Sequence, residues 1–332
     1  MKRLPSGILI FLFALSLYVF TMGGRIYSPD CEIMFRTTES IVERFETSIE
    51  PLMGFATRQS ADGREYAQYG IAQSVLAVPF YLAGKALSAV VDESFLQTLR
   101  EDTIQYYPLS LSAYTKRFGV SFYNLFVTAL TVTLVYFLTR GIYRCEKMGI
   151  FCALLYGIGT VAWPQSKPFF SEATAAFFLL LCFAVQCGDC LKGQHFLLAG
   201  FALGMALLTR VDSVVAFPAL GLFALLRAFE TGMRRGADTR TALLRIVAFA
   251  LPVILALVFI AGYNHFRFGS FTATGYEDQE EGIAFETPIL VGLYGQLFSA
   301  GKGLFVYSPV LILLFWALPR FVRKFPLQSL IL

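Results

Sequence analysis

The sequence YSPDCE, residues 27–32, directly follows an apolar run over residues 7–22. The run predicts a membrane span, and Asp30 and Glu32 then belong at the membrane face, because moving either carboxylate to the bilayer centre costs roughly 2.5–3.5 kcal/mol. In a helix beginning near Asp30 the two side chains would point about 200° apart, so they need not share a target. The purely local alternative is a helix amino terminus, with Asp30 as the cap and Glu32 in the first turn.

The composition indicates a membrane protein. Of 332 residues, 56% are hydrophobic and only 15% are charged. Soluble domains of this length are rarely so apolar, so we predict an all-α polytopic membrane protein. We expect membrane lipid to surround it and no nucleic acid to bind it.

The cysteines and histidines indicate neither a disulfide framework nor a zinc site. Cys31 alone falls in a predicted external loop, and the other cysteines lie in or beside apolar runs. Cys187 and Cys190 have redox or metal spacing, but no second pair accompanies them. The two histidines, His195 and His265, are far apart in the sequence.

The apolar runs define eight expected spans. They cover residues 7–22, 118–139, 148–163, 172–187, 195–209, 213–227, 243–262 and 304–318. We therefore expect a first transmembrane helix within 1–22, an external loop over 23–117, and a bundle of seven further spans over 118–332. The last residues, 325–332, read as the start of another span, so we expect a chain truncated at its carboxyl terminus.

The segment 70–91 is the ambiguous one, because it is apolar but contains Gln73, Pro79, Gly84 and Lys85. If it does not span, the arginine-rich loop at 227–245 lies on the amino-terminal side of the membrane, as the positive-inside rule favours. If it spans, that loop moves to the other side. We therefore expect a re-entrant or interfacial helix here.

A second flat helix is expected over residues 32–49. Its apolar side would hold Met34, Ile41, Phe45 and Ile49, and its polar side would hold Arg36, Glu39, Glu43 and Glu46. Residues 57–65 read as a polar turn region. Together the two flat helices would cover an external cavity.

Three further external segments hold candidate functional groups, and in each a purely architectural loop is the alternative. Residues 163–172 include Lys167 and Glu172, and residues 263–276 include Arg267. Residues 299–303 place Lys302 between glycines, where a backbone and a cation can approach an anion. The short connection at Arg210 and Asp212 reads as a hairpin with a local ion pair.

These features resemble the GT-C superfamily of membrane glycosyltransferases, which contains protein O-mannosyltransferases and the bacterial aminoarabinose transferase of lipid A. The resemblance rests on the acidic motif after the first span and on four short stretches: YGIAQS at 69–74, FFSE at 169–172, FRFGS at 266–270 and GLFVYSP at 303–309. It covers most of the chain. The cysteine between the two carboxylates departs from the pattern.

The resemblance implies an inverting transfer from a polyprenyl phosphate sugar to a lipid, glycan or protein acceptor on the periplasmic face of a bacterial inner membrane. The amino terminus would be cytoplasmic. By the resemblance Asp30 is the candidate base and Glu32 a helper. Both could hold Mg²⁺ or Mn²⁺ if a divalent ion is used, although none is required. Glu172 could bind a sugar hydroxyl, and the candidate phosphate-binding residues are Lys167, Arg210, Arg267 and Lys302.

Two other classes of protein fit the sequence. A lipid-linked-sugar transporter would place ionisable groups at mid-membrane and carry an internal repeat, neither of which is visible here. A non-catalytic membrane scaffold could use the large acidic loop to bind a partner. Convergence of Asp30, Glu32 and the basic external residues on one cavity would favour the enzyme.

Overall fold

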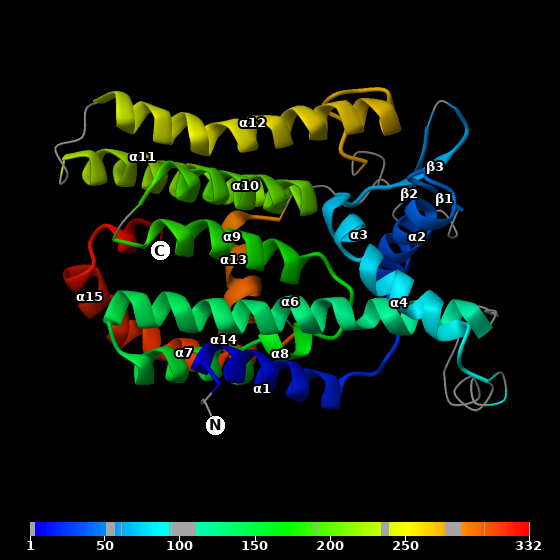
Figure 1. The fold of residues 1–332 in the computed structure, drawn as a ribbon, viewed down its shortest axis with the longest axis horizontal. Helices are drawn as coiled ribbons and strands as arrows, with labels where there is room; N and C mark the ends of the chain where they lie inside the picture. Colours follow the sequence, from blue (N-terminus) through cyan, green and yellow to red (C-terminus); the bar gives the residue numbers. More distant parts are fainter. Residues whose placement is uncertain are drawn as a thin grey trace.

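The computed structural model describes residues 4–50, 57–60, 62–92, 94, 111–189, 191–233, 239–275, 287–301 and 303–331. Its main body is a bundle of helices that run in alternating directions (Figure 1). The bundle helices are α1 (Ser6–Thr21), α6 (Leu111–Tyr143), α7 (Glu146–Gly159), α9 (Glu172–Gln186), α10 (Gly193–Thr209), α11 (Phe217–Met233), which follows the 3₁₀ helix η1 (Val211–Ala216), and α12 (Thr239–Phe268).

A layer of short elements covers one end of the bundle, which we term the loop end (Figure 1). It consists of α2 (Pro29–Glu43), α3 (Ala72–Leu76), α4 (Val78–Ser88) and a small antiparallel sheet of β1 (Ser48–Ile49), β2 (Thr57–Gln59) and β3 (Glu65–Ala67). The strand order is β1-β3-β2, and Tyr66 of β3 is paired with both Ser48 and Arg58. Among the residues that the structure describes, the regular elements are therefore helical apart from this sheet.

The opposite end of the bundle, which we term the basic end, is fastened by two buried arginines. Arg227 of α11 donates to the Gln186 carbonyl at 2.9 Å, and Arg245 of α12 donates to the Leu191 carbonyl at 3.3 Å. The last carbonyls of a helix, such as that of Gln186 in α9, have no partner within it, and the Leu191 carbonyl lies in the connection to α10. The two arginines therefore tie α11 and α12 to the end of α9 and the connection that follows it. This end also carries Arg140, Arg144, Lys147, Lys192 and Arg240.

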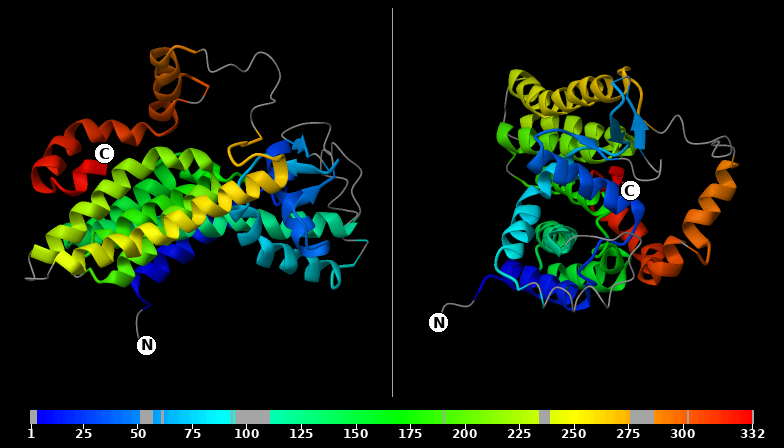
Figure 2. Two further views of the ribbon diagram at one scale, coloured as in Figure 1. Left: turned by 90° about the horizontal axis from the view of Figure 1, so that it is seen from above. Right: turned by 90° about the vertical axis from the view of Figure 1, so that its right-hand side faces the viewer.

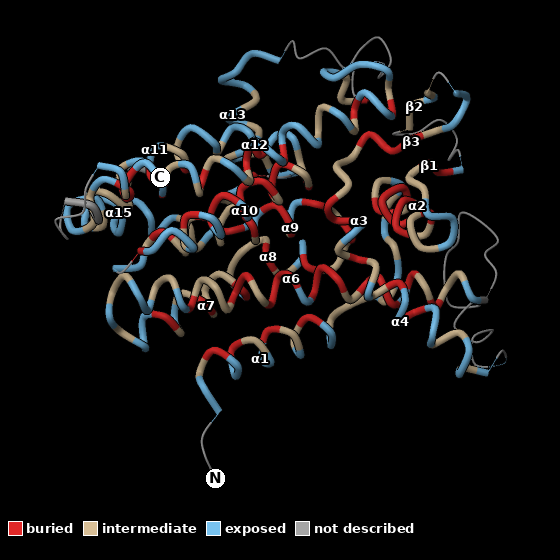
Figure 3. The backbone as a smooth tube through the Cα atoms, turned by 45° about the horizontal axis from the view of Figure 1, so that its top comes forward, coloured by how far each residue is buried: buried red, intermediate tan, exposed pale blue. Residues whose placement is uncertain are grey.

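The core of the bundle lies around α10, whose residues are coloured as buried in Figure 3 over much of its length. Small residues allow α12 to approach closely. A Cβ added at Gly200 would lie 2.0 Å from the carbonyl oxygen of Phe249, and one at Gly204 would lie 3.1 Å from that of Pro252. Close backbone approach through glycine is typical of helices that pack in a membrane.

In the described part of the chain, three helical segments are long and apolar enough to cross a membrane: Ser112–Tyr143, Val211–Glu230 and Thr239–Phe268. They contain the expected spans 118–139, 213–227 and 243–262, which confirms a helical membrane protein at this coarse level. The expected spans 7–22, 172–187 and 195–209 coincide with apolar helices of 16, 15 and 17 residues. The span expected over 148–163 divides between α7 and the short α8 (Ala162–Gln165).

The prediction of a continuous span over 304–318 is wrong. The region is broken into α14 (Leu304–Tyr307), the 3₁₀ helix η2 (Pro309–Leu313) and α15 (Leu314–Lys324). Pro309 disfavours helical backbone at Ser308, which is fully buried and accepts a hydrogen bond from the Val161 amide at 3.0 Å. The remaining carboxyl-terminal elements are α13 (Ile289–Phe298) and η3 (Gln328–Ile331), and Figure 2 shows this orange-to-red segment beside the bundle.

Two predictions for the external loop also need correction. The helix expected over 32–49 ends at Glu43, and Phe45 has a φ of 57°, outside the helical range. Phe45 is 93% exposed and does not lie on a buried apolar side. The turn region expected over 57–65 contributes the paired strands β2 and β3. The ambiguous segment 70–91 forms α3 and α4, which at 5 and 11 residues are too short to cross a bilayer.

Helix α6 joins the bundle to the loop end. Its 33 residues give it a length of about 50 Å, more than a bilayer core needs. Its amino-terminal part packs against α4, where a Cβ added at Gly119 would lie 2.4 Å from the Phe80 carbonyl oxygen. The side chains at this end of α6 can therefore reach the loop layer.

Candidate functional site

The acidic motif lies at the start of α2. Ser28 caps the helix, since its Oγ accepts a hydrogen bond from the Cys31 amide at 3.3 Å, and Pro29 occupies the first helical position. The local prediction that Asp30 is the cap is therefore wrong, and Asp30 lies in the first turn. The Asp30 side chain is half-buried, and within the described part of the chain its carboxylate has no hydrogen bond or ion pair.

Cys31 is fully buried directly behind Asp30. The pKa of its thiol is raised to about 11, chiefly by burial and to a smaller extent by the charges of Asp30 and Glu172. Hydrogen bonds from Ser28 and the Phe169 backbone offset part of this rise. The thiol is therefore neutral at physiological pH and packs α2 against the segment before α9. Asp30 and Glu172 both lie near it, although they are far apart in sequence.

The segment between α8 and α9 is held in place by side chains from other helices. The Trp163 Nε1 donates to Thr21 Oγ1 at 3.0 Å. The Gln73 Nε2 donates to the Phe169 carbonyl at 2.9 Å, and Asn124 Nδ2 donates to that of Phe170 at 2.8 Å. The sequence stretches 69–74 and 169–172 are thus in direct contact.

Sequence reasoning did not identify Gln73 as a positioning residue. It is fully buried, and its Oε1 accepts a hydrogen bond from Thr174 Oγ1 at 2.8 Å. The available signal was an amide within an otherwise apolar segment, because a buried polar side chain is normally satisfied by specific partners.

Arg210, at the carboxyl end of α10, bridges two acidic side chains. Its Nη1 donates to Glu172 Oε1 at 2.5 Å, and its Nη2 donates to Asp212 Oδ2 at 2.8 Å. The predicted ion pair with Asp212 is confirmed, and Glu172 joins it. All three side chains are at least partly exposed, so the cluster is open to a ligand.

Lys167 lies in the same segment, two residues before Phe169, and its side chain is half-buried. Within the described ranges its ammonium group has no hydrogen bond or ion pair, while its amide donates to the Pro164 carbonyl at 3.3 Å. It is therefore available for an anion. The other lysine predicted to bind phosphate, Lys302, lies outside the described residues.

Glu32 faces α6 instead of this cluster. It accepts hydrogen bonds from Arg117 Nε at 3.0 Å and from Arg36 Nε at 3.1 Å, and its side chain is 13% exposed. Burial alone would raise the pKa of Glu32, but the hydrogen bonds and charges of Arg117 and Arg36 outweigh it and lower that pKa. With its oxygens held by guanidinium groups, Glu32 does not fit the predicted metal site with Asp30.

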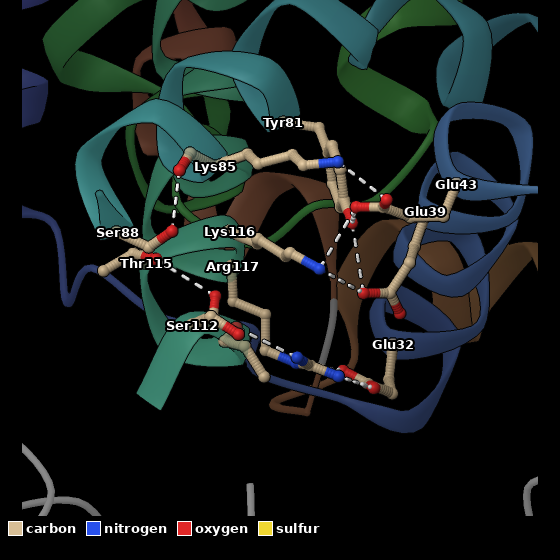
Figure 4. Close-up of polar contacts among 11 residues, drawn as sticks. Glu32, Glu39, Glu43, Tyr81, Lys85, Ser88, Ser112, Thr115, Lys116 and Arg117 are labelled. Carbon is tan, nitrogen blue, oxygen red and sulfur yellow. Dashed lines mark hydrogen bonds and ion pairs between the residues drawn. The ribbon is translucent and has the colours of Figure 1, made fainter. Parts of the chain in front are cut away.

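The polar side of α2 continues this internal contact, as Figure 4 shows. Glu43 accepts from Tyr81 Oη and from Lys85 Nζ, each at 2.7 Å, and Glu39 accepts from Lys116 Nζ at 3.3 Å. Glu39 and Glu43 thus lie together on the polar side of the helix, as predicted, but this side is covered by other helices. They face α4 and α6 because those helices supply the cations.

Arg267 is likewise turned inward. It is 4% exposed, and its guanidinium donates to the Tyr69 carbonyl at 3.1 Å and to Asn264 Oδ1 at 2.8 Å. The same group lies 4.1 Å from the Tyr263 ring centroid and 4.5 Å from that of Phe268. It joins α12 to the chain that leaves β3, and the structure does not bring it to the surface beside Asp30.

An apolar groove of about 550 Å³ begins beside the Arg210 cluster. It runs between α9 and η1–α11, with Asp212 and Ser213 at its polar end, and its apolar walls are formed by Leu179, Leu180, Phe183, Val215, Ala216, Ala219 and Leu220.

A larger hollow of about 670 Å³ lies at the basic end, lined by Arg140, Arg144 and Asp189 among others, and is remote from Asp30.

No family model, no curated protein and no solved structure matches the chain. The resemblance to the GT-C superfamily therefore stays a prediction.

Proposed function

We propose that the protein is a membrane glycosyltransferase that moves a sugar from a polyprenyl phosphate to an acceptor hydroxyl at the loop end. The observation that carries this proposal is the Asp30 carboxylate. It is half-buried, has no hydrogen bond or ion pair within the described chain, and shares the surroundings of Cys31 with Glu172. A carboxylate that is free in this way can accept a proton, whereas Glu32 is held by arginines.

Asp30 acts as the general base in a single displacement. Its carboxylate takes the proton of the acceptor hydroxyl while the acceptor oxygen forms a bond to the anomeric carbon. The bond from that carbon to the phosphate oxygen breaks, its electron pair stays on the lipid phosphate, and the anomeric configuration inverts. Glu32 supports this arrangement indirectly by fixing the first turns of α2 on α6.

The donor phosphate is bound by Lys167 and Arg210. Lys167 has no ion-pair partner among the described residues, and Arg210 is 32% exposed between its two carboxylates. A cation in a partly dry site stabilises the charge that develops on a leaving phosphate. Glu172 accepts from a sugar hydroxyl, and the apolar groove beside Asp212 receives the first part of the lipid chain.

The distribution of charge supports an orientation for this reaction. The basic end carries an excess of arginine and lysine in short connections, which is typical of the cytoplasmic side of a membrane protein. The loop end then lies outside, in the periplasm if the membrane is a bacterial inner membrane. A polyprenyl phosphate sugar would reach Asp30 from the outer leaflet.

Transfer of radiolabelled sugar from a panel of polyprenyl phosphate donors, in membranes containing the full chain, tests the proposal. We expect Asp30→Asn to lower the rate about 10²–10⁴-fold, the usual contribution of a positioned general base. The control is Asp62→Asn, which removes an exposed carboxylate from the β2–β3 turn of the same loop layer. It should leave the rate unchanged at equal protein level.

Equal turnover by Asp30→Asn and the wild type would reject Asp30 as the base. Absence of transfer from every donor in both proteins would reject the glycosyltransferase and favour a non-catalytic scaffold. Movement of an intact lipid-linked sugar across vesicles containing the protein, without transfer, would favour a transporter.

A further inference from the structure

Helix α15, with the sequence LFWALPRFVRK, has an apolar side and a basic side. At about 100° per residue, Leu314, Leu318 and Val322 fall on one side, and Arg320, Arg323 and Lys324 fall on the other. The described residues leave most of the apolar side uncovered: Leu314 is 46% exposed and Phe315 66% exposed. A helix of this kind is unusual on a surface that faces only water.

The position of α15 follows from its contacts with Tyr143, the last residue of α6. The Tyr143 ring centroid lies 5.3 Å from that of Phe325, and Lys324 Nζ lies 5.7 Å from the Tyr143 ring centroid. Arg140 is the first charged residue after the uncharged stretch 118–139 of α6, so the end of this helix lies near the level at which the chain leaves the bilayer. Figure 1 shows α15 at this end of the bundle.

We propose that α15 lies in the membrane interface at the basic end and binds anionic lipid headgroups. Its 11 residues give a length of about 16 Å, too short to cross a hydrocarbon core of about 30 Å. Its apolar side enters the boundary of the acyl chains, and Arg320, Arg323 and Lys324 contact the headgroups.

Charge complementarity identifies anionic lipid as the occupant. The basic side of α15 adjoins the end of α6, which adds Arg140 and Arg144 to the same level. An apolar patch alone would fit either lipid or protein, but a basic rim at the edge of a membrane span fits an anionic bilayer surface. This inference does not depend on the proposed glycosyltransferase activity.

The tryptophans make a depth measurement possible, because the chain has only two, Trp163 and Trp316. Trp163→Phe leaves Trp316, which falls among the basic residues of α15. Adding Trp316→Phe and Leu318→Trp moves the single tryptophan to the apolar side, about 160° away on the helix. The full chain carrying either set is reconstituted in phosphatidylcholine vesicles, with or without phosphatidylglycerol, that contain lipids brominated near the headgroup or near the bilayer centre.

We expect bromines near the headgroup to quench the tryptophan fluorescence of the Leu318→Trp protein at least about twice as strongly as that of the Trp316 protein. In the Leu318→Trp protein, bromines near the headgroup should also quench more strongly than bromines at the bilayer centre. Phosphatidylglycerol should increase this quenching. Changing Arg320, Arg323 and Lys324 to Gln should remove the phosphatidylglycerol-dependent part while leaving the α6 span in place. If Leu318→Trp prevents folding, Val322→Trp on the same side replaces it.

Three outcomes would overturn the proposal. Strongest quenching by central bromines at both positions would make this segment part of a span. Quenching of both positions by aqueous acrylamide but not by bromines would place α15 in water. Protection of the Leu318→Trp protein from both quenchers, with no effect of phosphatidylglycerol, would indicate that protein covers the apolar side.

Discussion

Arg117, on the first turns of α6, holds Glu32 of α2 with two hydrogen bonds, from Nε to Oε2 at 3.0 Å and from Nη2 to Oε1 at 2.5 Å. Their side chains are 10% and 13% exposed. The Arg117 guanidinium also lies 4.3 Å from the Phe35 ring centroid. This contact fixes the helix that carries Asp30 to the helix that enters the membrane.

We predict that Arg117→Gln destabilises the protein by about 3–5 kcal/mol, because it leaves the Glu32 carboxylate buried with a weaker set of partners. The double variant Glu32→Gln/Arg117→Gln should lose less than the sum of the two single changes. Chemical unfolding in detergent measures these values. Additive losses would show that the pair is not coupled.

Arg36→Gln is the matched comparison, since Arg36 bonds the same carboxylate at 3.1 Å from one turn away on α2. Pairs at this helical spacing contribute about 0.2–0.5 kcal/mol. A loss equal to that of Arg117→Gln would contradict the special role of the contact between α2 and α6.

Gly119→Ala should separate α4 from α6. The added Cβ would lie 2.4 Å from the Phe80 carbonyl oxygen and 2.8 Å from the Gly84 backbone, and backbone atoms cannot move aside cheaply. We expect a loss of about 1–3 kcal/mol, as for other overpacked contacts.

Gly141→Ala in the same helix is the control, because among the described residues nothing outside its own stretch of helix lies within 4 Å of the added Cβ. Alanine favours helix over glycine by about 0.8–1.0 kcal/mol, so this variant should be neutral or more stable. Thermal unfolding in detergent compares the two. Equal effects at both positions would show that the α4–α6 contact is not tight.

Acid should weaken the contact between α2 and α4. The hydrogen bond from Lys85, followed by that from Tyr81, lowers the pKa of Glu43 from 4.5 to about 2. Because the pKa is lower in the folded state, this contribution to stability is present at neutral pH and is lost as the pH falls from about 4.5 through about 2.

The thermal midpoint measured at steps from about pH 7 to about pH 3 tests this. The wild type should lose more stability over this range than Glu43→Gln, and Lys85→Gln should resemble the carboxylate variant. The difference should be small, since Glu43 is 30% exposed and water screens the pair. Parallel curves for all three proteins would contradict the prediction.

Arg210→Gln should weaken donor binding if the proposed function is correct. It removes the cation between Glu172 and Asp212 and leaves two like charges where the lipid phosphate would sit. We expect the KM for the polyprenyl phosphate sugar to rise about tenfold or more, since a charge-assisted contact to phosphate is lost. Arg210→Lys, which keeps the positive charge, should raise the KM less than Arg210→Gln does. An unchanged KM would remove Arg210 from the site.

The sequence by itself determined the helical, apolar character of the chain and the accumulation of basic residues on alternate connections. Both are local properties: a run of apolar residues long enough to cross a membrane must satisfy its own backbone hydrogen bonds as a helix. The sequence also showed that 70–91 is interrupted, through its proline, glycine and polar residues.

Only the tertiary structure decided which charged residues are available for chemistry. Glu32 and Arg117 are 85 positions apart, and Arg267 reaches the Tyr69 carbonyl across 198 positions. Whether a charged side chain is neutralised by such a partner or left free, as Asp30 and Lys167 are among the described residues, depends on packing between distant segments. Residue type and spacing along the chain do not distinguish a charged side chain that has a partner from one that has none. The difference arises only when the helices pack together.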